Sequence, residues 1–106
     1  MATGKVESFN YVHSITPSEK VTINSGGYIQ IGKVVILSVK MTSKAAISQN
    51  DILASGIPAS IQNVAINIGV GYNANAYSCR TGGSNIYANG AIPNGTEMNL
   101  NIAYIT

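Results

Sequence analysis

Apolar residues recur at every second position between Tyr28 and Thr42, except at Lys33, and this alternation restricts the fold more than any other feature of the chain. The odd positions carry Ile29, Ile31, Val35, Leu37, Val39 and Met41. Because successive side chains of a strand point to opposite faces, the pattern predicts one long strand with a buried face. Val34 and Ile36 interrupt the alternation, so the middle of this strand is expected to meet apolar partners on both faces. Gly32 is expected at a bulge or a close approach of backbones.

Other β-branched runs predict further strands, since Ile and Val fit a pleated surface better than a helix. A closing strand is expected where Glu97, Asn99, Asn101 and Ala103 alternate with Met98, Leu100, Ile102 and Tyr104. A further strand is expected over Ile61–Tyr72, with shorter ones over Val21–Asn24, Tyr77–Thr81 and Asn85–Ala88 and a weaker candidate over Phe9–Ile15. The helical candidate is a single turn over Ser48–Ala54.

Proline and glycine separate these runs, because proline fixes φ and glycine permits a positive φ. Turns are expected at Pro17, Ser25–Gly27, Gly56–Pro58, Gly82–Gly83 and Asn89–Gly90. Seven or eight short strands with frequent turns predict an all-β antiparallel sandwich or barrel. At 106 residues, the chain is the size of one domain.

The chain carries little charge: 9% of its residues are charged, against roughly 25% in ordinary soluble domains. Its 45% apolar content excludes a disordered chain. The net charge is +2 with no basic cluster, so no nucleic-acid partner is expected. No apolar run approaches the roughly 20 residues that span a bilayer, so no membrane insertion is expected. Cys79 is the single cysteine, which predicts synthesis in a reducing cytoplasm.

The sequence does not present the groups of a catalytic site. The four acids, Glu7, Glu19, Asp51 and Glu97, are widely spaced, so no local pattern predicts a pair of catalytic carboxylates. His13 and Cys79 would be the only members of a nucleophile–base pair, but a lone cysteine in a β protein is usually a small buried hydrophobe. No metal, no cofactor and no enzymatic activity are therefore expected.

Tyrosine and asparagine gather between residues 72 and 89, where the chain has Tyr72, Tyr77 and Tyr87 with Asn73, Asn75, Asn85, Asn89 and Arg80. Flat amphipathic rings beside amide groups suit sugars, whose faces stack and whose hydroxyls need paired donors and acceptors. The predicted ligand-binding residues are Tyr72, Asn73, Asn75, Tyr77 and Arg80. Rim packing of the tyrosines and turn formation by the asparagines is the alternative interpretation.

The order of several short motifs resembles a known family. They are Gly27 to Val35; Ile52 with Gly56-Ile57-Pro58-Ala59; Ile86-Tyr87-Ala88-Asn89-Gly90; and Met98 to Thr106. Together they are similar to the C-terminal head domains of receptor-binding or minor structural proteins in the tails of bacteriophages and prophages. The resemblance covers residues 20–106, leaving residues 1–19 as a lead-in or the remnant of a longer chain.

This resemblance implies an antiparallel β-sandwich of jelly-roll type, assembled as a homotrimer in the phage tail. It implies contacts with other tail or baseplate proteins and non-catalytic binding of a host cell-surface glycan. Two alternatives stay open: a purely structural virion or baseplate module without a ligand, and a lectin-like carbohydrate-binding module of a bacterial protein.

Overall fold

The computed structural model describes residues 12–69 and 77–106, and in these residues the chain is all-β, with no helix and so none that could cross a membrane. The strands are β1 (Thr16–Pro17), β2 (Val21–Ile31), β3 (Val34–Ser43), β4 (Ile52–Ser55), β5 (Ala65–Gly69), β6 (Tyr77–Gly82), β7 (Asn85–Ala88) and β8 (Glu97–Ile105). The prediction of an all-β fold is confirmed, and the strands expected over Tyr77–Thr81, Asn85–Ala88 and the C-terminal run are present.

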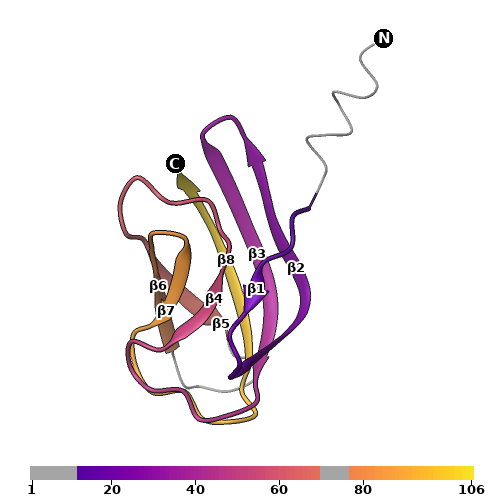
Figure 1. The fold of residues 1–106 in the computed structure, drawn as a ribbon, viewed down its shortest axis with the longest axis vertical. Coiled ribbons are helices and arrows are strands. Elements are labelled where there is room, and N and C mark those ends of the chain that lie inside the picture. The colour runs from indigo at the N-terminus through magenta and orange to yellow at the C-terminus, as the bar shows by residue number, and fades with distance from the viewer. Residues whose placement is uncertain (1–11, 70–76) are drawn as a thin grey trace.

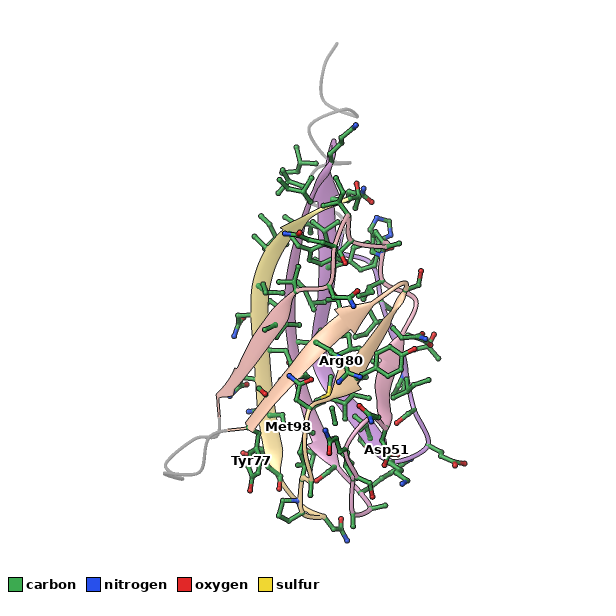
Figure 2. All side chains as sticks on the ribbon, turned by 90° about the vertical axis from the view of Figure 1, so that its left-hand side faces the viewer. Asp51, Tyr77, Arg80 and Met98 are labelled. Atoms are coloured by element: carbon green, nitrogen blue, oxygen red, sulfur yellow. The ribbon has the colours of Figure 1, made fainter. Side chains whose placement is uncertain are left out.

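All strand pairs are antiparallel, in the order β1-β4-β7-β6-β5-β8-β3-β2. The β5–β8 pairing is short, with Ile68 opposite Leu100 and Gly69 opposite Asn99. This seam divides the strands into a half of five (β1, β4, β7, β6 and β5) and a half of three (β8, β3 and β2). The β6–β7 hairpin lies to the left of the long strands β8, β3 and β2 in Figure 1 and in front of them in Figure 2, which is turned by 90°, so the two halves face each other as layers.

The segment from His13 to Pro17 connects the two outer strands of this order. The backbone of His13 exchanges two hydrogen bonds with Tyr28 on β2, with N···O distances of 2.8 and 3.0 Å. A few residues later, Thr16 and Pro17 pair with Ser55 and Ala54 on β4. The same short segment therefore pairs with β2 and with β4, one strand from each half of the fold.

The core lies between the two halves. On β3 the predicted alternation is confirmed: Val35, Leu37, Val39 and Met41 are buried, whereas Val34 and Ile36 point to the outer face and are each 43% exposed. Met98, Leu100 and Tyr104 supply the core residues of β8. The five-stranded half contributes buried side chains that include Leu53, Ile66, Cys79, Ile86 and Ala88. Ile15 is also buried, so residues ahead of position 20 take part in the core.

The prediction of one strand from Tyr28 to Thr42 is wrong, because a hairpin turn at Gly32 and Lys33 separates β2 from β3. Gly32 has a φ of +59° at the first of the two turn positions. A glycine at that position is what a two-residue hairpin of type II′ requires. The turn joins two apolar strand ends, so apolar residues stand directly on both sides of Gly32 and Lys33.

The turn expected at Ser25–Gly27 is also wrong, because these residues lie inside β2. A β-bulge shifts the register between Ile23 and Ser25, and Gly26 follows with a φ of +91°. A side chain at Gly26 would overlap the carbonyl oxygen of Ser38, and one at Gly27 would overlap that of His13. The two glycines therefore allow the backbone of β2 to lie close to the backbone at Ser38 and at His13.

Two other expectations need correction. The turn around Ser48–Ala54 is not helical: the Ser48 N–H donates to Asp51 Oδ2 at 2.8 Å, and β4 begins at Ile52. The strand expected over Ile61–Tyr72 begins only at Ala65, and Ile61 is 75% exposed in a bend. Val70 and Tyr72, which were expected on that strand, lie outside the described residues, as does the beginning of the Phe9–Ile15 candidate.

Candidate functional site

Two of the five predicted ligand-binding residues lie within the described part of the chain. Tyr77 begins β6, and Arg80 lies three residues along the same strand. Tyr77 packs partly against the core, as alternation with the buried Cys79 requires, whereas Arg80 is on the other face. Figure 2 shows Tyr77 and Asp51 near the end of the molecule opposite the β2–β3 turn, with Arg80 nearer its middle. Tyr72, Asn73 and Asn75 lie outside the described residues.

The Arg80 guanidinium ties the β6–β7 hairpin to the loop before β4. Nη1 donates to Asn89 Oδ1 at 2.7 Å and to the Ala88 carbonyl at 3.3 Å, and Nη2 donates to Asn50 Oδ1 at 2.9 Å. The Arg80 Cζ atom also lies 5.2 Å from the centroid of the Tyr87 ring, on the paired position of β7. These contacts hold a cation over an aromatic face and orient two asparagine amides from separate loops.

A hollow of about 280 Å³ lies where β6 begins and β7 ends, lined by Tyr77, Ser78, Asn89, Gly90 and Ala91. Asn89 is fixed at its wall: Nδ2 donates to Ser78 Oγ at 3.0 Å, and Oδ1 accepts from Arg80. A primary amide has two N–H donors and two acceptor lone pairs. With these two bonds made, one donor and one acceptor of Asn89 remain for a ligand, already oriented.

A second hollow, of about 370 Å³, is lined by Ser18, Glu19, Lys20, Asn50, Asp51 and Ile52. Lys20 Nζ and Asp51 Oδ2 form an ion pair there at 2.8 Å. The hydrogen bond from Lys20, followed by that from the Ser48 N–H, lowers the pKa of the Asp51 carboxyl below its usual value. Asn50 contributes to this hollow and also binds Arg80, so the Arg80 side chain links the two hollows.

Sequence reasoning missed most of this arrangement. Lys20 and Asp51 are 31 residues apart, and Asn50 and Arg80 are 30 residues apart, so no local spacing connects them. The signal in the sequence is the cluster of asparagines near Arg80. This cluster includes Asn89, but the predicted ligand-binding set takes only Asn73 and Asn75 from it.

The His13 and Cys79 side chains lie in different environments. Cys79 is fully buried, and desolvation raises the pKa of its thiol to about 12. The exposed His13 ring stacks on Tyr28, with ring centroids 5.0 Å apart. A thiol with this pKa does not supply a thiolate near neutral pH, so Cys79 is part of the core and not a nucleophile. Among residues 12–69 and 77–106, no group of three or more His, Cys, Asp or Glu side chains could hold a metal ion.

The Cys79 thiol is expected to react slowly with Ellman's reagent in the native protein and completely after denaturation. Both its burial and its raised pKa suppress the reactive thiolate, so native labelling has to wait for opening of the structure. The rate should be followed at several urea concentrations below the unfolding transition. Fast, complete labelling of folded protein would contradict the burial of this side chain.

Comparison with known proteins gives no relative of this chain. Known protein families, curated proteins and solved structures were each searched, and none of them matches. The likeness to phage tail head domains therefore rests on the order of the motifs between Gly27 and Thr106.

Proposed function

We propose that the chain is the non-catalytic head domain of a phage or prophage tail protein and binds a host cell-surface saccharide. The observation that carries this proposal is the hollow beside Tyr77, where Arg80 and Ser78 hold the Asn89 amide in one orientation. Sugar recognition needs such fixed donors and acceptors, because each hydroxyl both donates and accepts. The order of the motifs and the low charge of the chain support the same assignment.

Binding at this hollow would combine one aromatic contact with a bidentate amide contact. The unused N–H and lone pair of Asn89 would pair with neighbouring hydroxyls of a sugar ring, and the edge or face of Tyr77 would pack against its C–H groups.

One such shallow site binds weakly, with a dissociation constant in the millimolar range. Presentation of several copies on one particle would raise the overall affinity by roughly 10²–10⁴ without any new contact. We propose a homotrimer in the virion tail, anchored through other tail or baseplate proteins. Synthesis in the bacterial cytoplasm agrees with a single buried thiol.

Tyr77→Ala is expected to weaken saccharide binding about tenfold, or about 1.4 kcal/mol, because it removes the aromatic wall of the hollow. The measurement is a titration on an array of bacterial cell-wall and capsular saccharides. Ile102→Ala is the matched control, because Ile102 is also a partly buried side chain packed against the core but lies on β8 and not at this hollow. It should lose similar stability and keep its binding.

Equal binding by Tyr77→Ala and the wild type would move the site away from this hollow.

A purely structural virion or baseplate module is the second candidate function, favoured by the internal bonds that already occupy Arg80. Such a module should bind no saccharide on the array. A lectin-like module of a bacterial protein would bind saccharide in the same assay, and tail genes beside its own gene would exclude it.

A further inference from the structure

The outer face of the three-stranded half is divided into an apolar and a polar end. Directly paired residues of neighbouring antiparallel strands lie on the same face. Val34 therefore lies between Ile31 and Ile105, and in the next row Ile36 lies between Ile29 and Ala103. These six residues are called the apolar end. The following rows are polar: Gly27, Ser38 and Asn101; Ser25, Lys40 and Asn99; Thr22, Thr42 and Glu97.

The apolar end and its two apolar neighbours, Val12 and Ile61, form a patch that is large for a single chain. Four of its residues are 43–54% exposed, and Val12 and Ile61 extend it on either side with 52% and 75% exposure. Together these side chains expose on the order of 500 Å², in the upper part of the roughly 300–600 Å² of the largest patches on monomers. No charged residue lies in its two rows.

This face carries both an apolar hollow and an apolar projection. The hollow, of about 280 Å³, borders Gly26 and Gly27, and its other walls include Val12, Ile29 and Ile36. The projection is the row of Ile31, Val34 and Ile105, beside the β2–β3 turn at the end of the molecule where β8 also finishes (Figure 1). A surface with both shapes can pack against a second copy, with the projection of one copy entering the hollow of the other.

The same surface also has the polarity and charge that self-association needs. A stable interface buries about 800 Å² on each partner, with an apolar centre and a polar rim. The apolar end would form that centre, and the adjoining row of Gly27, Ser38 and Asn101 would form part of the rim. Interface cores are depleted in charge, as these rows are. We propose that the apolar end packs against the apolar end of a second copy of this chain, with the Val34 row of one copy in the Gly27 hollow of the next.

Ile36→Lys tests this proposal, because Ile36 lies in the apolar end and borders the hollow. Light scattering on a sizing column at micromolar concentration should give the wild type a mass of two or three 11.0 kDa chains. The variant should run as one chain, with an association constant at least about 30-fold lower. Thr42→Lys is the matched control: it places the same charge on the same face of β3, in the polar end, and should leave the mass unchanged.

The measured masses test this interface independently of saccharide binding, and they also distinguish a dimer from the proposed trimer. The proposed interface would be overturned if the wild type had the mass of one chain, or if the Ile36→Lys protein stayed associated. Either result would hold whatever the saccharide array shows. A mass of two chains would support the interface and exclude the homotrimer. Should Ile36→Lys fail to fold by circular dichroism, Val34→Lys carries the test, because Val34 lies next to the hairpin turn, where a lysine can extend into solvent.

Discussion

Replacing Gly26 by alanine is expected to lower the free energy of unfolding by about 3 kcal/mol or more. Two effects add at this position. The φ of +91° is strained for any residue with a Cβ atom, at a cost of about 1–3 kcal/mol. In addition, the new Cβ would overlap the carbonyl oxygen of Ser38 on the paired strand, which is backbone and cannot rotate away. Urea unfolding followed by circular dichroism measures the loss.

Gly32→Ala separates the two effects. Gly32 also has a positive φ, of +59°, but a Cβ there would meet no atom within 4 Å. Its replacement should cost only the backbone strain, about 1–2 kcal/mol. Equal losses in the two variants would show that β2 can move away from β3, and that the close approach at Gly26 is not required for folding.

Leu100→Ala is expected to lower the free energy of unfolding by about 3–5 kcal/mol, the upper range for a buried leucine. Leu100 is fully buried at the seam, where β8 pairs with Val39 of β3 on one side and with Ile68 of β5 on the other. A cavity there removes contacts to both halves of the fold, and neither half can close it alone. For a domain stable by about 5–15 kcal/mol, the loss is a large fraction of the total.

Leu100→Met is the control, because it nearly conserves the side-chain volume and should cost less than about 1.5 kcal/mol. Both variants should be unfolded in urea with two probes, tyrosine fluorescence and far-ultraviolet circular dichroism. The two probes should report one transition. If the free energy of unfolding of Leu100→Ala lay within about 1 kcal/mol of the wild-type value, the main core would lie elsewhere.

The alternation of the sequence predicted which residues of β3 and β8 are buried, because a period of two follows directly from strand geometry. It could not locate the turn at Gly32, since apolar residues continue on both sides of it. Nor could it separate the turn glycine from Gly26 and Gly27, which lie inside a strand. A glycine serves either a positive φ or a close approach, and the atoms approached at Gly26 and Gly27 belong to Ser38 and His13. Only the tertiary structure brings these atoms together.

The candidate site was predicted less completely than the fold. The sequence pointed to Tyr77 and Arg80, but placed them together as ligand contacts. In the structure Arg80 binds Asn50 and Asn89, and Asn89 is the amide presented at the hollow. Asn50 comes from a loop 30 residues earlier, and long-range partners of this kind leave no local pattern. The contributions of Tyr72, Asn73 and Asn75 stay predictions.

The position of β8 has a consequence for folding during synthesis on the ribosome. β8 is the last strand along the chain, yet it occupies an interior place in the strand order, joining β3 to β5. Its partner residues on β3 lie up to 71 positions earlier, as in the pairing of Val34 with Ile105. Until this strand leaves the exit tunnel, the emerging polypeptide has two separate strand groups with unfilled apolar faces. Completion of the fold therefore waits until β8 has been synthesised.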